Sequence, residues 1–260
     1  MVLEPSVFIT LIAVAGAAGF VDSIAGGGGL LTVPALLAAG LPPVSAIATN
    51  KVQSICGTSS ACYAFAKRGH IDFKTIWFPA VGSFVGSALG AITLQKISPN
   101  ILAGVMPIIL ILMAGYFVFS PKISDEDRHR ILGPLPYALV AAAIGFYDGF
   151  FGPGAGSFFA VSLVTLAGMG IIRATGHTKV LNVASNLGAL ILMAAGGHII
   201  WTLGLSMAVA NVAGAQLGSR SAMRFGSRLI KPLLATISVA LAIKLLLDPA
   251  NPLSQLIWKR

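Results

Sequence analysis

Four apolar stretches of membrane-spanning length constrain the fold of this chain more than any other feature. They are residues 74–95, 100–119, 172–196 and 230–247. Each approaches the roughly 20 residues that an α-helix needs to cross the hydrocarbon core of a bilayer, whereas a buried strand of a soluble protein has only about 4–8 apolar residues in a row. Only 10% of the residues are charged, against roughly 25% in an average soluble domain. The sequence therefore predicts an all-α polytopic membrane protein.

The net charge of +9 fits the same class of protein. Most basic residues fall in short segments between apolar stretches, as the positive-inside rule describes, and no motif for RNA or DNA binding accompanies them. Cys56 and Cys62 lie within one apolar stretch and are expected to be small buried residues. The chain shows no metal-ligand spacing, no Ser-His-Asp arrangement and no phosphate loop. We therefore expect no nucleic-acid partner, no enzymatic activity, no metal and no cofactor.

The chain is internally duplicated. The segment "GFVDSIAGGGG" (19–29) matches "GFYDGFFGPGAG" (145–156), with Asp22 opposite Asp148 at an offset of 126. Further along, Lys51 matches Lys179 and "GSALG" (86–90) matches "GAQLG" (214–218), both at an offset of 128. Because so many polar and glycine positions match in register, we predict two repeats. The first covers residues 1–120 and the second 134–260, with a charged linker at 121–133 between them.

Each repeat is expected to contain about five helical segments. In the first repeat these are 6–20, 29–40, 45–66, 74–95 and 100–119. In the second repeat they are 134–150, 156–168, 172–196, 201–220 and 230–247. The first two segments of each repeat are expected to be short helices, separated by a glycine-rich break.

The distribution of lysine and arginine predicts how the repeats are oriented. If each repeat crosses the membrane an odd number of times, one side carries eleven basic loop residues and the other three; with four crossings the split is eight to six. The odd count follows the positive-inside rule better. It predicts inverted repeats, with the linker in the cytoplasm and both termini outside a bacterial inner membrane. A short helix pair that crosses twice and one that forms a re-entrant hairpin both give an odd count, so both remain open.

Two aspartates lie inside apolar segments. Of the eight acidic residues only Asp22 and Asp148 do so, and they occupy matching positions in the two repeats. A carboxylate within the bilayer costs at least about 2.5–3.5 kcal/mol on insertion scales, so each needs a function or a partner. One hypothesis is a site that couples transport to protons or sodium. The other is that the carboxylate accepts hydrogen bonds from glycine amides and fixes the helix break.

Two lysines, Lys51 and Lys179, also lie inside predicted helices. Each sits about two turns, roughly 9 Å, from the start of its helix, so its side chain could still reach the membrane surface. Polar neighbours favour a different interpretation, in which both lysines face a polar cavity and bind an anion. These neighbours are Thr49, Asn50, Gln53 and Ser54 in the first repeat and His177, Thr178 and Asn182 in the second.

The glycine runs are expected to expose helix N-termini inside the membrane. Free N–H groups at a helix N-terminus attract anions, and two such ends related by inversion can meet at one site. The glycines concerned are Gly26, Gly27, Gly28 and Gly29 in the first repeat and Gly152, Gly154 and Gly156 in the second. In contrast, Gly82, Gly86 and Gly90 are spaced four residues apart, which is typical of close helix packing.

These motifs, in this order, resemble the sulfite exporter family of the TauE/SafE type. The resemblance is carried by "GFVDSIAGGGGLLTVPALLAAGLPP" (19–43), "IATNKVQS" (47–54), "GSALG" (86–90), "GFYDGFFGPGAGSFF" (145–159) and "GHTKVLNVASN" (176–186). It implies transport of small sulfur-containing anions such as sulfite, thiosulfate or organosulfonates. The second repeat departs from the pattern at Pro153 and Ala155, so the two repeats are expected to contribute unequally.

We therefore predict a secondary transporter of such an anion that works by alternating access in the lipid bilayer. The lysines and helix N-termini would hold the anion, and the aspartates would couple or shape the site. Proton coupling, sodium coupling and a homodimeric state are all compatible with the sequence. Three alternatives remain: an anion channel of similar selectivity, a transporter of another small organic anion, and a membrane enzyme or assembly subunit.

Overall fold

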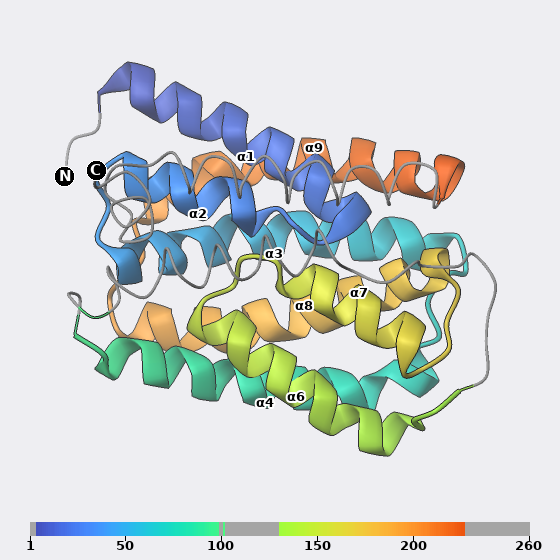
Figure 1. The fold of residues 1–260 in the computed structure, drawn as a ribbon. Helices are drawn as coiled ribbons and strands as arrows, with labels where there is room; N and C mark the ends of the chain where they lie inside the picture. The colour runs from blue at the N-terminus through green and yellow to red at the C-terminus, as the bar shows by residue number, and fades with distance from the viewer. Residues whose placement is uncertain (1–3, 99–100, 102–129, 227–260) are drawn as a thin grey trace, which may run out of the picture.

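A computed structural model describes residues 4–98, 101 and 130–226 of the chain. These residues form helices that lie side by side in a bundle, with no strand among them (Figure 1). The helices are α1 (Pro5–Ala25), α2 (Gly29–Ala38), α3 (Pro43–Lys67), α4 (Phe73–Lys96), α6 (Pro134–Phe150), α7 (Ala155–Thr165), α8 (Ile171–Ala195) and α9 (Trp201–Phe225). The predicted segments 100–119 and 230–247 and most of the predicted linker lie outside the described residues.

Three of the described helices are long and apolar enough to cross a membrane. They are α1, α4 and α8, and the last two correspond to the predicted stretches 74–95 and 172–196. Helices α3 and α9 have 25 residues each and carry more polar side chains. The predicted class, an all-helical membrane protein, is confirmed.

Prolines and glycines set most of the helix ends. Proline occupies the first turn of α1, α3 and α6, where its missing N–H would have no intrahelical partner. At the break after α1, Gly26 has a φ of 74°, and before α7 Gly154 has a φ of 84°. Other residues rarely adopt this left-handed backbone, so the glycine runs fix where these helices stop and start.

The first segment of the chain is longer than predicted. Helix α1 has 21 residues, roughly 31 Å at 1.5 Å per residue, and continues past Asp22 to Ala25 because Gly26 is the first residue that leaves the helical backbone. The expectation of a short first helix is therefore wrong. Helices α2 and α7 are short, as predicted, with 10 and 11 residues.

Helices α1 and α2 form one hairpin, and α6 and α7 form another (Figure 1). The tips of the two hairpins, residues 26–28 and 151–154, are adjacent inside the bundle. A Cβ atom on Gly26 would lie 2.3 Å from the carbonyl carbon of Gly156, and one on Gly156 would lie 2.6 Å from the Cα of Gly26. Such contacts leave no room for a side chain, so glycine is required at both positions.

Glycines also bring the long helices together. A Cβ atom on Gly86 in α4 would lie 2.0 Å from the carbonyl oxygen of Ala142 in α6, and one on Gly214 in α9 would lie 1.9 Å from that of Gly16 in α1. Gly86 and Gly214 are matching positions of the two repeats. The helices that they contact, α6 and α1, also correspond to each other. The predicted packing role of Gly82, Gly86 and Gly90 is confirmed, because all three face the backbone of α6.

Candidate functional site

The two hairpin tips and the middle of α3 and α8 enclose a small polar cavity. Its volume of about 20 Å³ is enough for roughly one water molecule. The cavity is lined by Asp22, Gly26, Gly29, Asn50, Lys51, Ser54, Thr58, Asp148, Gly152, Gly156, Asn182 and Asn186. In this conformation the site is closed to an ion of the size of sulfite.

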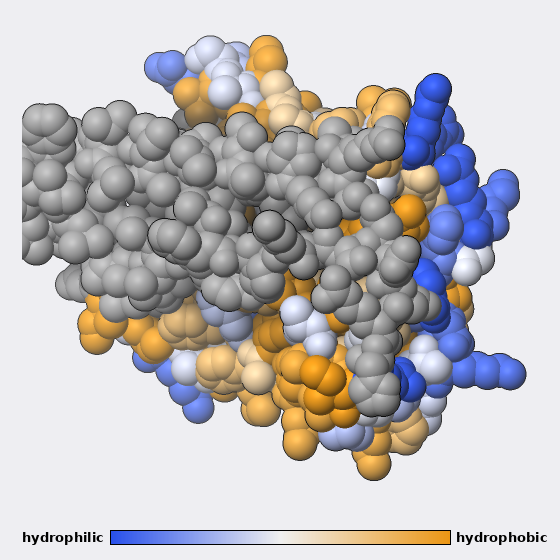
Figure 2. Space-filling model, turned by 45° about the vertical axis from the view of Figure 1, so that its right-hand side comes forward, coloured by the Kyte–Doolittle hydropathy of each residue, from blue (hydrophilic) through white to orange (hydrophobic). Residues whose placement is uncertain are grey.

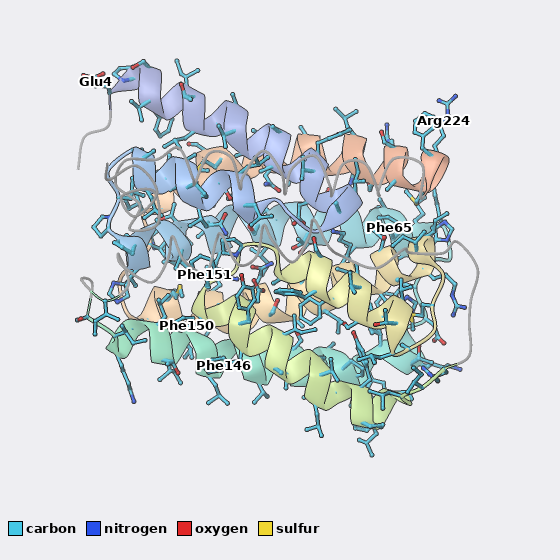
Figure 3. All side chains as sticks on the ribbon, viewed as in Figure 1. Glu4, Phe65, Phe146, Phe150, Phe151 and Arg224 are labelled. Atoms are coloured by element: carbon cyan, nitrogen blue, oxygen red, sulfur yellow. The ribbon has the colours of Figure 1, made fainter. Side chains whose placement is uncertain are left out.

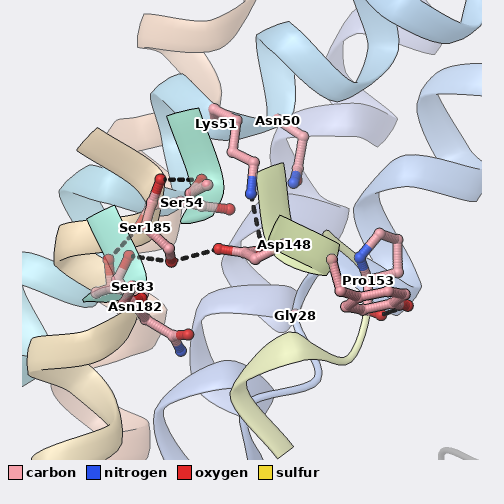
Figure 4. Close-up of polar contacts among 12 residues, drawn as sticks. Gly28, Asn50, Lys51, Ser54, Ser83, Asp148, Pro153, Asn182 and Ser185 are labelled. Carbon is pink, nitrogen blue, oxygen red and sulfur yellow. Dashed lines mark hydrogen bonds and ion pairs between the residues drawn. The ribbon is translucent and has the colours of Figure 1, made fainter. Parts of the chain in front are cut away.

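A buried ion pair forms one wall of this cavity. The Lys51 ammonium donates to Asp148 Oδ1 at 2.7 Å, and the two side chains are only 1% and 6% exposed. The hydroxyl of Ser185 donates to the other carboxylate oxygen, Oδ2 (Figure 4). Both oxygens of Asp148 are therefore occupied, and the buried charge of Lys51 is neutralised.

Lys179 and Asp22, which match Lys51 and Asp148 in the duplicated sequence, form a second and looser ion pair. The Lys179 ammonium donates to the main-chain carbonyl of Asp22 and lies 3.6 Å from the carboxylate oxygen Oδ2. The other carboxylate oxygen, Oδ1, accepts the N–H of Gly28 at 3.2 Å. The Lys179 side chain is fully buried, whereas that of Asp22 is 20% exposed.

Each aspartate thus pairs with the lysine of the other repeat. Asp148 lies in the last turn of the hairpin helix α6 and meets Lys51 of α3, and Asp22 lies in the last turn of α1 and meets Lys179 of α8. The negative end of a helix dipole disfavours a carboxylate, and the lysine opposite compensates for it. The hydrogen bond from the Gly28 N–H to Asp22 also agrees with the hypothesis that this carboxylate fixes the helix break after α1. Asp148 accepts no glycine N–H within the described residues.

Two helix N-termini contribute unused donors to the cavity. The backbone amides of Gly29, at the start of α2, and Gly156, in the first turn of α7, have no hydrogen-bond acceptor within the described residues. Both residues line the cavity. A helix N-terminus with free N–H groups is a favourable place for an anion. The closed cavity is therefore lined by two residues, Gly29 and Gly156, whose amides could bind an anion.

Comparison with known proteins shows the family to which the chain belongs. A family model described as Sulfite exporter TauE/SafE matches residues 11–245. The chain belongs to this family. Probable membrane transporter protein ORF9 of Sinorhizobium sp. is 47% identical over 242 residues, which cover 93% of this chain and 92% of that protein. Escherichia coli K12 YfcA, also named as a probable membrane transporter, is 44% identical over 247 residues, or 95% and 92% of the two chains.

More distant relatives carry the same kind of name. Probable membrane transporter protein YjnA of Bacillus subtilis is 24% identical over 250 residues, which cover 87% of this chain and 96% of that protein. No solved structure matches the chain. The TauE/SafE protein described here is therefore a membrane transporter and not an enzyme, as the sequence indicated.

Several of the residues predicted to bind the anion lie away from the cavity of the transporter. The Thr49 hydroxyl accepts the N–H of Ile200 at 3.1 Å, and His177 Nε2 accepts the N–H of Asp72 at 3.2 Å. Both contacts hold helices to neighbouring loops. Lys179, Gln53, Thr178, Gly27, Gly28 and Gly154 also fall outside the cavity lining. Of the predicted polar neighbours, Asn50, Ser54 and Asn182 do line it.

The sequence interpretation missed Thr58 and Asn186, which complete the cavity lining. They match at the offset of 128, and each lies one helical turn after a predicted residue, Ser54 or Asn182, on the same helix face. Helical periodicity alone would have found them. Asn211 of α9 was also missed. Its amide donates to Gln53 and to the carbonyl of Ala15, and no motif marks it in the sequence.

Proposed function

We propose that this transporter carries small sulfur-containing anions, such as sulfite, thiosulfate or organosulfonates, across the membrane by alternating access. The observation that carries the proposal is the Lys51–Asp148 pair at the wall of a cavity with two unused helix N-terminal amides. Oxyanions of sulfur accept hydrogen bonds through several oxygens. Such an anion would replace the Asp148 carboxylate on Lys51 and receive the N–H groups of Gly29 and Gly156.

Alternating access fits the layout of the two hairpins. In Figure 1, α1 and α6 run in opposite directions, and the hairpins enter the bundle from opposite ends. Corresponding helices also make corresponding contacts, since α4 packs on α6 as α9 packs on α1. These features support the predicted inverted repeats. The position of both hairpin tips inside the bundle supports a re-entrant form of the pairs α1–α2 and α6–α7. In many inverted-repeat transporters, one structural unit rocks against another around a central site. The cavity must widen before it can hold an anion, and such a motion would widen it.

The charge distribution supports one orientation in a bacterial inner membrane. Hydrophilic side chains gather at one end of the molecule (Figure 2). The exposed basic residues at this end are Lys67, Arg68, Lys74, Arg130, Arg173, Arg220 and Arg224. Glu4, at the start of α1, lies at the opposite end from Arg224 (Figure 3). By the positive-inside rule, the basic end would face the cytoplasm and α1 would begin outside.

The same ion pair offers a mechanism for proton coupling. If Asp148 takes up a proton, Lys51 loses its partner and needs another negative charge, so anion and proton would bind together. Sodium coupling would instead require the carboxylate to bind the cation while the anion takes the lysine. Export of an anion without coupling would gain about 2.3 kcal/mol per charge per 100 mV from an inside-negative potential.

Flux measurements on the full chain in liposomes test the proposal. The substrates are sulfite, thiosulfate, sulfoacetate, taurine and sulfate, each followed with a pH gradient, with a sodium gradient and with neither. We expect saturable uptake and countertransport of at least one sulfur anion, lost in both Lys51→Ala and Lys179→Ala. Lys96→Ala, which removes an exposed lysine at the opposite end of the bundle from the basic cluster, is the control.

Three results would contradict the proposal. Full affinity in both lysine variants would show that the anion binds elsewhere. Single-channel currents would replace the transporter mechanism with an anion channel. The absence of saturable flux for every sulfur compound in the panel would reject the proposed substrate class. The pH and sodium arms, repeated with Asp22→Asn and Asp148→Asn, identify the coupling ion.

A further inference from the structure

A second polar cavity lies between α3 and α9 at the basic end of the bundle. Its volume is about 340 Å³, within the range of small-ligand pockets. Three cationic side chains line it: Lys67 and Arg68 at the end of α3 and Arg220 on α9. The described residues that line it are all different from those that line the central cavity.

Within the part of the chain that the structure describes, no carboxylate pairs with the cations of this cavity. Both ion pairs found among the described residues belong to the central site, and the described residues that line the second cavity include no carboxylate. The guanidinium of Arg68 contacts the sulfur of Met223 at 3.8 Å, which holds it across the gap between the two helices. Three like charges around one space repel each other, so an anionic ligand would stabilise the arrangement.

Helix packing does not require these charges. The duplication provides an internal comparison, because α8 packs on α4 as α3 packs on α9. At the offset of 128, the positions that match Lys67, Arg68 and Arg220 are Ala195, Gly196 and Ile92. The matching helix pair thus packs with uncharged residues at all three places. The positive charge is found on one helix pair only. The positive-inside rule accounts for the side of the membrane on which these residues lie, but it does not account for three of them lining one cavity.

We propose that this cavity binds the phosphate group of an anionic lipid headgroup or of a soluble phosphate compound. Arginine offers a planar fork of donors that matches phosphate oxygens, and lysine adds a point charge. Basic pockets between transmembrane helices at the cytoplasmic side are suited to lipid headgroups. Tyr63, which lines the cavity and is 66% exposed, has the amphipathic character of residues at the membrane–water interface.

Binding by the purified full chain in a neutral detergent tests this site. The probes are dioctanoyl phosphatidylglycerol, dioctanoyl phosphatidylcholine, glycerol 3-phosphate and inorganic phosphate, and the dissociation constant is measured for each. The double variant Lys67→Gln/Arg220→Gln removes two cations from the cavity. Lys96→Gln/Arg224→Gln removes the same charge from residues outside its lining. We expect about fivefold weaker binding for each cavity charge removed, or about 25-fold for the double variant, and unchanged binding in the control.

The probes separate the two sources of the phosphate. Saturable binding of phosphatidylglycerol alone supports a lipid site, and competition by glycerol 3-phosphate or inorganic phosphate supports a soluble ligand. Equal weakening in the cavity and control variants, or no saturable binding of any phosphate probe to the unaltered protein, overturns the proposal. If the double variant does not fold, Ala64→Phe decides, because it fills the cavity without a change in charge. Loss of binding supports the site, and retained affinity overturns it.

Discussion

Replacing Asp148 by asparagine is expected to destabilise the transporter more than the matching change at Asp22. The Lys51 ammonium lies 2.7 Å from Asp148 Oδ1, with both side chains buried. At an effective dielectric constant of about 20, their attraction is about 6 kcal/mol, which offsets a desolvation penalty of several kcal/mol for each ion. Removing one partner leaves the other buried and unpaired, at a cost of about 3–5 kcal/mol.

The matching pair keeps more of its contacts when Asp22 is changed. Lys179 donates to the main-chain carbonyl of Asp22, and this contact does not depend on the side chain. The ammonium is 3.6 Å from Oδ2, and the Asp22 side chain is 20% exposed, so water can replace part of the lost interaction. We expect Asp22→Asn to cost about 1.5–3 kcal/mol, the usual value of a hydrogen bond to a charged group.

The free energy of unfolding in mixed micelles of dodecyl maltoside and sodium dodecyl sulfate, followed by tryptophan fluorescence, measures both costs. Lys51→Met, alone and combined with Asp148→Asn, completes a double-mutant cycle. The double variant should recover part of the loss, because no buried charge remains in it. A larger cost at Asp22 than at Asp148, or strictly additive single costs at Lys51 and Asp148, would refute the reasoning from burial and pairing.

Three further predictions concern the contacts around the site. Gly26→Ala should abolish folding, because its Cβ atom would lie 2.3 Å from the carbonyl carbon of Gly156. Gly27→Ala should be tolerated, because the nearest atom to its Cβ would be 3.5 Å away. The yield of monodisperse protein distinguishes the two variants. Ser185→Ala, which removes the hydroxyl donor to Asp148, should lower the free energy of unfolding by about 1.5–3 kcal/mol. Gly214→Ala should lower the unfolding midpoint sharply, because its Cβ atom would lie 1.9 Å from the carbonyl oxygen of Gly16. Gly16→Ala on the facing helix should not, because the nearest atom to its Cβ would be 3.6 Å away. Equal shifts in the two variants would contradict the packing argument.

The sequence predicted the helices well because their causes are local. Apolar length placed α4 and α8 within one residue of their observed ends, and α3 within two. The error at α1 has a local cause too. The prediction ended the helix at residue 20, whereas the backbone stays helical past Asp22 and continues until the left-handed Gly26.

The residues of the central site could be predicted individually, but not their pairing. The cost of a charge within the bilayer marks Asp22, Asp148, Lys51 and Lys179 without any knowledge of the fold. The same cost implies that each charged side chain has a partner, but it does not identify the partner residue. The partners are 97 residues apart in one pair and 157 in the other, so they depend on how the repeats pack together. The Asn211 contact with Gln53 is non-local in the same way.

The exchange of partners between repeats links the fold to the proposed mechanism. Each ion pair joins the hairpin of one repeat to a long helix of the other, α6 to α3 and α1 to α8. Among the described residues, neither buried lysine is paired with an aspartate of its own repeat. On the proposed mechanism, a motion that widens the cavity by moving α6 from α3 separates Lys51 from Asp148. That separation is unfavourable unless an anion takes the place of the carboxylate or a proton neutralises it. The same contacts that hold the repeats together would then make opening dependent on what the site has bound.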